Sequence, residues 1–307
     1  MELSVVTTLY NSRRFLDDFI TQITAAIGQC GFTSYEIIFV NDGSPDDSLQ
    51  FLISKQRTTP NLVIVDLSRN FGHHYAMQAG LSQAKGDLIF LIDNDLETPP
   101  AFLIDCQRAL NADPSIDVVY GYQAERSGGA GSLGGKFFWW SINKVSDVKI
   151  PKNILTERLM RRHYVNSLLQ LGDANLFLGG MMYWAGYNQL GLPVEKGIRD
   201  GASTYSTKKR MALMVQAVTS FSGKPLEYLF YTGLLITVGS ILAIVFLVAK
   251  KLILGDAIEL GWTSLVVLNV LILGILSTFL GLIGIYLFKI FRQVQNRPNA
   301  IIKKIYE

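Results

Sequence analysis

The sequence has few cysteines and little net charge. Its two cysteines, Cys30 and Cys106, stand far apart without metal-ligand spacing, and we expect both to be buried thiols in a reducing compartment. The net charge of +3 is too small to indicate binding to nucleic acid. No charged and then apolar leader precedes the first strand-like run, which begins at Leu3, so we expect no cleaved signal peptide and a cytoplasmic N-terminal domain.

Charge is also missing from two long stretches near the C-terminus. Residues 262–288 hold no charged residue, and residues 226–249 hold only Glu227. At about 1.5 Å per helical residue, each stretch exceeds the roughly 30 Å of hydrocarbon in a bilayer, so together they predict a transmembrane helical hairpin. Basic residues gather on both flanks of the hairpin: Lys208, Lys209, Arg210, Lys224, Lys289, Arg292, Arg297, Lys303 and Lys304. The positive-inside rule then places the preceding domain and the following tail in the cytoplasm.

The region before residue 224 alternates short apolar runs with amphipathic ones. We predict strands at residues 3–8, 35–40, 62–67, 88–92 and 117–121, and helices at residues 14–27, 46–56 and 73–84. Apolar strands that alternate with helices predict a mostly parallel sheet with helices on both faces, in which ligands bind at the carboxyl ends of the strands. Polar residues follow four predicted strands at that edge: Asn11, Asp42, Ser68, Arg69, Asn70, Asp93 and Asp95.

The acidic segment after the fourth predicted strand has carboxylates at alternate positions. Asp93, Asp95 and Glu97 offer the hard oxygen ligands that Mg²⁺ and Mn²⁺ prefer, and such a cation would neutralise charge on a departing diphosphate. A solvated turn ahead of Pro99 and Pro100 is the alternative interpretation.

Asp42 follows the second predicted strand directly. Its carboxylate can accept hydrogen bonds from a nucleobase or a ribose, and Gly43 permits a sharp turn after it. The same segment is equally typical of a helix N-cap, with Ser44 or Asp46 as the capping residue.

Two further segments are candidates for contact with a membrane surface. A glycine-rich stretch at 128–135 leads into four aromatic residues at 137–140, where tryptophan would favour the headgroup region, although packing into the core is the alternative. Residues 206–221 form an amphipathic pattern whose basic face could meet anionic headgroups, or could be an ordinary solvated helix face.

Four ordered segments resemble the family 2 glycosyltransferases: residues 4–11 (SVVTTLYN), 36–44 (EIIFVNDGS), 67–73 (LSRNFGH) and 93–96 (DNDL). With residues 219–226 (TSFSGKPL) and the hairpin, the chain is more closely similar to the polyprenyl-phosphate hexosyltransferases. That group includes dolichol-phosphate mannose synthases and the bacterial undecaprenyl-phosphate glucosyltransferases of O-antigen modification.

The resemblance implies an organisation and an activity. It implies an α/β domain of the GT-A, Rossmann-like type at 1–205, a juxtamembrane amphipathic helix at 206–225, a hairpin at 226–288 (spans 226–249 and 262–288) and a basic cytoplasmic tail at 289–307. It also implies inverting transfer of one hexose from a nucleotide-sugar, foremost a UDP-sugar, to undecaprenyl phosphate. The protein would then be a multi-pass protein of the inner membrane that serves cell-envelope polysaccharide.

The resemblance also implies roles for particular residues. Asp93 and Asp95 would be catalytic, and Asp95 and Glu97 would hold Mg²⁺ or Mn²⁺. The residues expected to bind the nucleotide-sugar are Thr8, Tyr10, Asn11, Asp42, Arg69, Asn70 and Asp93. A lipid phosphate acceptor needs basic partners, for which the candidates are Arg126, Lys136 and Arg158.

The chain departs from the family pattern at three places. Glu97 stands where the family usually has Gln, and Ser12 stands where it usually has Glu, which puts one nucleoside contact in doubt. Residues 154–158 (ILTER) stand where related glucosyltransferases have Ala-Gly-Asp-Phe-Arg. The arginine is kept and the aspartate is lost, which favours a hexose other than glucose.

Other functions fit the sequence less well. A diacylglycerol acceptor would need a general base, and none is evident beyond the three carboxylates. A non-catalytic membrane scaffold is disfavoured by the intact Asp93 and Asp95, and a processive synthase by the lack of a Gln-x-x-Arg-Trp segment. Self-association of the hairpin is expected from its small residues, Gly274, Ser277, Gly281 and Gly284.

Overall fold

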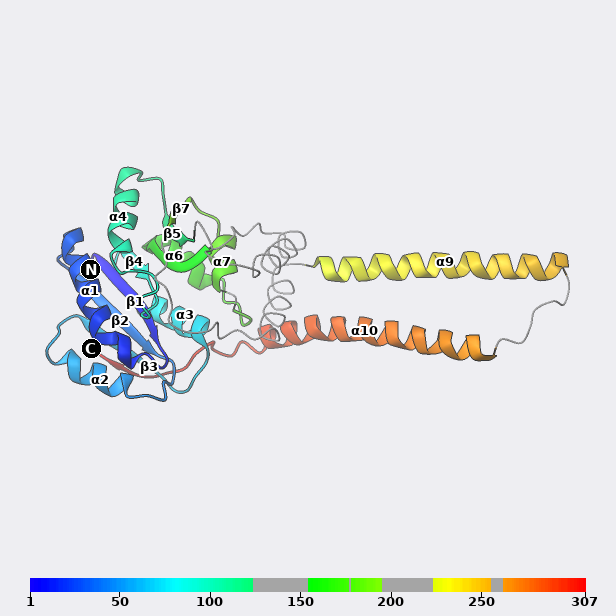
Figure 1. Cartoon of the computed structure of the whole chain (residues 1–307), viewed down its shortest axis with the longest axis horizontal. Helices are drawn as coiled ribbons and strands as arrows, with labels where there is room; N and C mark the ends of the chain where they lie inside the picture. The colour runs from blue at the N-terminus through cyan, green and yellow to red at the C-terminus, as the bar shows by residue number, and fades with distance from the viewer. Residues whose placement is uncertain (124–153, 177, 195–222, 255–261) are drawn as a thin grey trace.

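The computed structural model describes residues 1–123, 154–176, 178–194, 223–254 and 262–307. In these residues the chain forms an α/β domain, from which two long helices extend side by side (Figure 1). Both ends of the chain lie on the α/β domain. The predicted glycine-rich loop, the aromatic residues at 137–140 and the amphipathic helix at 206–221 lie outside the described residues.

The described strands form a single mixed sheet of eight. They are β1 (Leu3–Leu9), β2 (Tyr35–Asn41), β3 (Leu62–Leu67), β4 (Leu88–Leu91), β5 (Val118–Tyr122), β6 (Ile154–Arg161), β7 (Gln189–Pro193) and β8 (Ile302–Tyr306), in the order β7-β5-β6-β4-β1-β2-β3-β8. The central strands β4, β1, β2 and β3 are parallel, whereas β6 and β8 run antiparallel to their neighbours. The predicted mostly parallel α/β sheet is therefore confirmed.

Helices cover both faces of the sheet. One face carries α1 (Leu16–Cys30), α2 (Ser48–Gln56) and α4 (Phe102–Ala112), and the other carries α3 (His73–Gln83), α6 (Arg162–Gln170) and α7 (Leu178–Trp184). Because side chains alternate along a strand, Val5 of β1 packs in the first core and Val6 in the second. Burial on both faces explains why the central strands are apolar throughout.

The strand order has a switch point between β1 and β4, and we call the carboxyl ends of these two strands the crevice. The chain passes from β1 to β2 and β3 on one side of β1, and then returns to place β4 on the other side. In open α/β sheets a ligand binds where the order switches, outside the carboxyl ends of the strands. The expected site therefore lies at the ends of β1 and β4, with the ends of β2 and β3 beside it.

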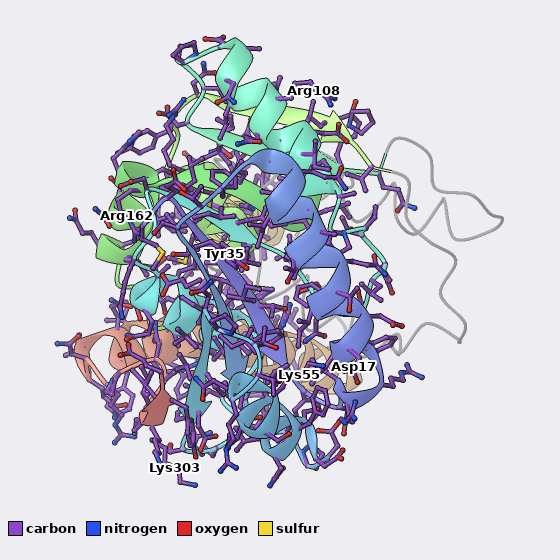
Figure 2. All side chains as sticks on the ribbon, turned by 90° about the vertical axis from the view of Figure 1, so that its left-hand side faces the viewer. Asp17, Tyr35, Lys55, Arg108, Arg162 and Lys303 are labelled. Carbon is purple, nitrogen blue, oxygen red and sulfur yellow. The ribbon has the colours of Figure 1, made fainter. Side chains whose placement is uncertain are left out.

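The C-terminal segment is part of the sheet, which the sequence analysis did not predict. It was expected to be a basic tail, but Ile302–Tyr306 pairs antiparallel with β3 as an edge strand. Lys303 of this strand lies 3.7 Å from the buried Asp66 carboxylate of β3. Seen from the domain end, Lys303 and Arg108 of α4 lie at opposite ends of the sheet (Figure 2).

The two long helices are α9 (Lys224–Leu254) and α10 (Trp262–Val294), and they contain the two predicted spans. In the described part of the chain, one segment has both the length and the apolar composition of a membrane span, Ile272–Val294, with a mean hydropathy of 1.9. The end of α10 is bonded to the domain. Gln293 accepts a hydrogen bond from the Ala174 N–H at 2.9 Å and donates to the Gly172 carbonyl at 3.1 Å.

Candidate active site

The loops that follow β2 and β3 contact each other closely. Asp42 accepts hydrogen bonds from the backbone N–H groups of Phe71, at 2.7 Å, and Gly72, at 3.0 Å. Gly43 has a φ of 61°, and a Cβ atom there would lie 2.6 Å from the Asn70 nitrogen. Only glycine fits this position without displacing the second loop.

Asp42 is buried, with 3% of its surface exposed. Burial raises the pKa of its carboxyl group, against the lowering effect of the two backbone N–H donors and of Arg69. In this structure its carboxylate organises the loop that carries Asn70. The nucleoside contact predicted for Asp42 stays a prediction, and it would use lone pairs that the two loop N–H groups leave available.

The loop after β1 is fastened to the loop after β2. Asn11 adopts a left-handed conformation with φ 54°, and its N–H donates to Ser44 Oγ at 2.8 Å. Ser44 donates in turn to Asp46 Oδ1 at 2.6 Å, and Asp46 also accepts from the Ser48 N–H at 3.2 Å at the start of α2. Asp46 thus bonds the first N–H of α2, but the N-cap residue of this helix is Asp47 and not the predicted Ser44 or Asp46; Tyr10 is exposed.

The acidic loop after β4 is held by its own backbone and by β1. Asn94 donates from Nδ2 to the Thr8 carbonyl at 2.8 Å, and the Glu97 N–H donates to Asp95 Oδ1 at 3.1 Å. Leu96, between the two carboxylates, has a φ of 61°, which is unusual for a residue other than glycine or asparagine. Such strained backbone is maintained where surrounding contacts fix it, often in functional loops.

His73 connects the ends of β1 and β4. Its Nδ1 lies 3.0 Å from Thr8 Oγ1, and its Nε2 lies 3.5 Å from Asp93 Oδ1. Crowding by protein atoms, and secondarily His74, lower the pKa of His73 to about 4; the side chain keeps 48% of its surface exposed, so solvent moderates the shift. The imidazole is therefore neutral near pH 7.

His73 was not predicted to be a site residue. It was quoted only as the last residue of the family-like segment at 67–73. The available signal was its place at the end of the loop after the third predicted strand, at the same sheet edge as Asp93.

The carboxylates do not form a complete metal centre by themselves. In the described residues no three His, Cys, Asp or Glu side chains converge as metal ligands. Asp95 and Glu97 belong to one short turn and supply carboxylate oxygens, which suit a hard divalent cation. Such a cation commonly takes one or two carboxylates and completes its shell with substrate phosphates and water, so this donor set fits it.

The acceptor role predicted for Arg158 stays a prediction, and the structure buries this arginine at the end of β4. Arg158 lies on β6 opposite Leu91 and is 1% exposed, in the interior of the sheet. Its guanidinium donates to the carbonyls of Thr156, at 2.9 Å, and Leu155, at 3.0 Å. Burial lowers its pKa, which neighbouring Tyr164 and Glu157 partly offset. The other two candidates, Arg126 and Lys136, lie outside the described residues.

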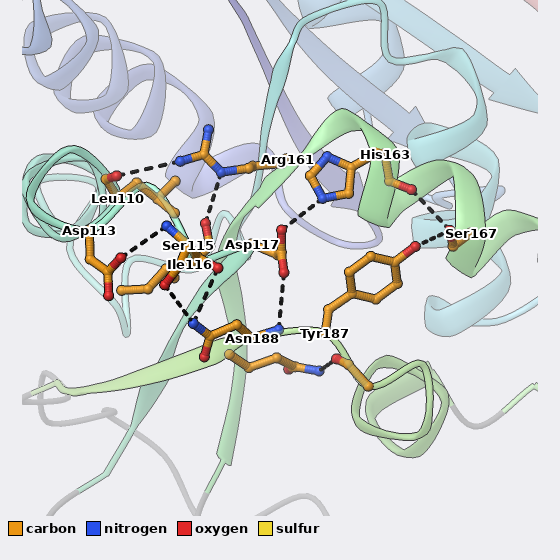
Figure 3. Close-up of polar contacts among 12 residues, drawn as sticks. Leu110, Asp113, Ser115, Ile116, Asp117, Arg161, His163, Ser167, Tyr187 and Asn188 are labelled. Carbon is orange, nitrogen blue, oxygen red and sulfur yellow. Dashed lines mark hydrogen bonds and ion pairs between the residues drawn. The ribbon is translucent and has the colours of Figure 1, made fainter.

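A second polar cluster lies at another edge of the domain, around β5 and β7 (Figure 3). Asp117 accepts from the Asn188 N–H at 3.0 Å and lies 2.8 Å from His163 Nε2. Arg161 donates to the Ile116 carbonyl at 2.8 Å. These contacts fasten the edge strand β7 and helix α6 to β5, and they are not part of the crevice at β1 and β4.

The geometry brings carboxylates, amides and a neutral histidine together at the carboxyl ends of the parallel strands. The model of glycosyl transferase family 2 matches residues 4–169, which include all four of these strand-end loops. The chain belongs to glycosyl transferase family 2. The predicted family and the predicted glycosyltransferase activity are thereby confirmed.

Similar proteins span the whole chain. A glycosyltransferase of Mycobacterium tuberculosis is 39% identical over 307 residues, which cover 100% of this chain and 89% of that protein. The SfII prophage-derived bactoprenol glucosyl transferase of Shigella flexneri is 30% identical and covers 99% and 98%. The solved mannosyltransferase PcManGT from Pyrobaculum calidifontis, in complex with GDP-Man and Mn²⁺, has a TM-score of 0.50 at 15% identity and covers 96% and 86%. This last likeness concerns the fold alone.

Proposed function

We propose that this glycosyltransferase moves one hexose from a nucleotide-sugar to a polyprenyl phosphate, such as undecaprenyl phosphate, with inversion at the sugar. The observation that carries the proposal is a short path of hydrogen bonds from the site to the base of the long helices. Tyr75, in the first turn of α3, donates to the Ala174 carbonyl at 3.0 Å, and the Ala174 N–H donates to Gln293 of α10. The crevice thus lies near the end of a helix apolar enough to cross a bilayer.

The acceptor is supported by a relative and by its chemistry. The Shigella flexneri relative is named for glucosyl transfer to bactoprenol. A lipid monophosphate has a second pKa of about 6, so near neutral pH it is already an anionic nucleophile that needs alignment more than a general base. Arg126 and Lys136 remain the proposed cationic partners of that phosphate.

The pairing of β8 with β3 supports a hairpin that crosses the membrane twice. Residues before α9 and residues after α10 belong to the same sheet, so both ends of the hairpin lie on one side of any bilayer. A chain that leaves and returns to one side crosses an even number of times. If Ile272–Val294 spans, α9 has to carry the chain across as well. The basic flanks favour the cytoplasmic side for the domain.

The donor is held at the strand ends, and a divalent cation fits beside it. Asp95 and Glu97 would hold Mg²⁺ or Mn²⁺ together with diphosphate oxygens. When bound, the cation neutralises charge that develops on the leaving nucleoside diphosphate. Asp93 lies next to this pair in the chain and at the end of β4, where it can accept hydrogen bonds from a sugar hydroxyl. The substituted segment at 154–158 favours a hexose other than glucose.

The test is transfer into lipid by the full-length protein. Membranes that contain it are incubated with undecaprenyl phosphate, Mg²⁺ or Mn²⁺, and a panel of labelled nucleotide-sugars. We expect label in the lipid phase that disappears with EDTA and with Asp95→Asn. The matched control is Asp105→Asn on α4, whose carboxylate is exposed and contacts only surface Arg108 at 3.1 Å among the described contacts.

The outcomes separate the competing functions. Label that persists in Asp95→Asn contradicts the metal role of this carboxylate. If the protein binds nucleotide-sugar and label enters diacylglycerol but not undecaprenyl phosphate, the acceptor is diacylglycerol. Absence of both binding and label favours the membrane scaffold.

A further inference from the structure

His73 stands at the junction of three elements in the crevice. It is the first residue of α3, and its ring lies between Thr8 at the end of β1 and Asp93 at the end of β4. The Thr8 carbonyl also receives the hydrogen bond from Asn94. Asn94 therefore attaches the segment that contains Asp93 to β1, and His73 lies between the same two segments, 3.0 Å from Thr8 Oγ1 and 3.5 Å from Asp93 Oδ1.

We propose that His73 is a positioning residue that orients the Asp93 carboxylate toward the donor sugar. The inference rests on the proposed function, because it assigns Asp93 a sugar to contact. Neither the family match nor the names of the relatives assign a role to this histidine.

Hydrogen-bond chemistry sets the direction of the contacts. An ionised carboxylate only accepts, so His73 faces Asp93 with a protonated Nε2. In that neutral tautomer Nδ1 carries a lone pair, and the Thr8 hydroxyl becomes the donor to it. The tautomer with the proton on Nδ1 would instead turn a lone pair toward the carboxylate, which is repulsive. Thr8, His73 and Asp93 thus form one chain of donors that ends on the carboxylate.

The distances fit a contact that closes when the donor binds. The Thr8 contact, at 3.0 Å, is of hydrogen-bond length, whereas the 3.5 Å between Nε2 and Asp93 exceeds the usual range of about 2.7–3.2 Å. Catalytic hydrogen bonds are often long without substrate and shorten in the complex. The lowered pKa of the ring means that it supports Asp93 without adding a positive charge beside the donor diphosphate.

A purely structural role is the competing explanation. His73 could simply fasten the start of α3 to β1 through Thr8. In that case its loss would lower stability and nucleotide affinity, whatever residue stands at 93. If His73 acts through Asp93, its loss should lower kcat only while the Asp93 carboxylate is present.

The first test is a double-mutant cycle on the full-length protein in membranes, with the nucleotide-sugar that supports transfer. We expect His73→Ala to lower kcat by about 10- to 100-fold, because a misoriented group costs on this scale, while the Kd for UDP changes less than about twofold. His73→Gln should regain part of kcat, since its amide can donate to Asp93. In an Asp93→Asn background, His73→Ala should lower kcat by less than about threefold further, because the effects of coupled residues are not additive. His74→Gln, at the next position of α3, is the matched control.

Full additivity of the two losses in kcat, or a fall in UDP affinity equal to the fall in kcat, would overturn the inference and favour the structural role.

The second test does not depend on transfer. The chain has three histidines, so ¹⁵N-histidine NMR signals can be assigned by substitution. We expect neutral His73 with the proton on Nε2, and a shift toward the other tautomer in Asp93→Ala. A proton on Nδ1 in the unmodified protein overturns the inference. If the proton is on Nε2 but the protein transfers no sugar to undecaprenyl phosphate, the inference about His73 stands and the proposed acceptor reaction is rejected.

Discussion

At the residue scale, the loops of the crevice depend on single positions that admit one kind of side chain. Asp42 and Gly43 are adjacent, yet they act differently. Asp42 binds the backbone of the loop after β3 through its carboxylate, and Gly43 allows that loop to approach because it has no side chain. Together they fix the position of Asn70, one of the predicted donor-binding residues.

Gly43→Ala should destabilise the domain and weaken donor binding. The new Cβ would meet the Asn70 backbone at 2.6 Å, and its φ of 61° is strained for alanine, so we expect a loss of about 1–3 kcal/mol. The control is Gly28→Ala on α1, where an added Cβ has no atom within 4 Å. Helix propensity should make the control neutral or more stable by up to about 1 kcal/mol. Thermal unfolding with and without UDP measures stability and donor binding for both variants. A melting temperature of Gly43→Ala equal to that of the native protein contradicts the argument.

Tyr164 should make stability fall at high pH. Burial raises the pKa of Tyr164 to about 12, and its hydroxyl donates to the Met182 carbonyl in the core. Its ordinary pKa is near 10, so above pH 10 the unfolded chain loses a proton that the folded chain keeps. Stability is therefore fully present below pH 10 and decreases toward pH 12, by up to about 3 kcal/mol. Denaturant unfolding of Tyr164→Phe should lack this decrease in the free energy of unfolding. A difference in stability between the variant and the native protein that does not change with pH contradicts the prediction.

Most of the predicted site residues lie at one edge of the sheet because they follow predicted strands. Asn11, Asp42, Asn70 and Asp93 all stand at the carboxyl ends of parallel strands, which periodicity alone locates. The burial of Arg158 could not be predicted from the sequence. Its charge suggests a surface, but a neighbouring strand and local carbonyls bury it, and the pairing with that strand depends on contacts between segments far apart in the chain.

At the element scale, the central strands were predicted closely and the edge strands were not. The predicted strand at 62–67 coincides with β3, whereas the predicted helix at 46–56 begins two residues later at Ser48, since Asp46 bonds backbone N–H groups at the helix start and in the loop after β1. Continuous apolar runs identify buried strands. The edge strand β8 (IKKIY) is short and has two exposed lysines at its centre, so its sequence was interpreted as a basic tail.

Deletion of residues 300–307 should destabilise the α/β domain. Without β8, the backbone of β3 becomes the sheet edge, and the partner of Val65 at Ile305 is lost. We expect a lower melting temperature of the full chain and lower donor affinity, because β3 leads into the Arg69–Asn70 loop. Lys303→Ala is the control; it removes only an exposed lysine paired with Asp66, worth about 1 kcal/mol or less. If deletion and control behave alike, β8 has no structural role.

At the scale of the whole molecule, the long helices are an insertion within the catalytic sheet. The chain leaves the domain after β7, forms α9 and α10, and returns to complete the sheet as β8. Contacts of Gln293 with Ala174 and Gly172 then tie the base of α10 to the domain. These hydrogen bonds fix the crevice relative to the base of α10.

The proposed double crossing predicts opposite accessibility of two positions. In a chain with Cys30 and Cys106 replaced by serine, Ile253→Cys at the far end of α9 should react with an impermeant maleimide added outside intact cells. Lys304→Cys on β8 should react only after the membrane is opened, because β8 belongs to the domain that we propose to be cytoplasmic. Equal labelling of both positions in intact cells contradicts a hairpin that crosses twice.

The sequence alone determined the local features of this protein. Apolar periodicity located the central strands, the length of the uncharged runs located α9 and α10, and ordered polar segments indicated the family. These depend on residues close in the chain. Only the tertiary structure decided that β8 completes the sheet, that Arg158 is buried and that His73 joins Thr8 to Asp93. Each depends on packing between residues far apart in sequence, which no local pattern encodes.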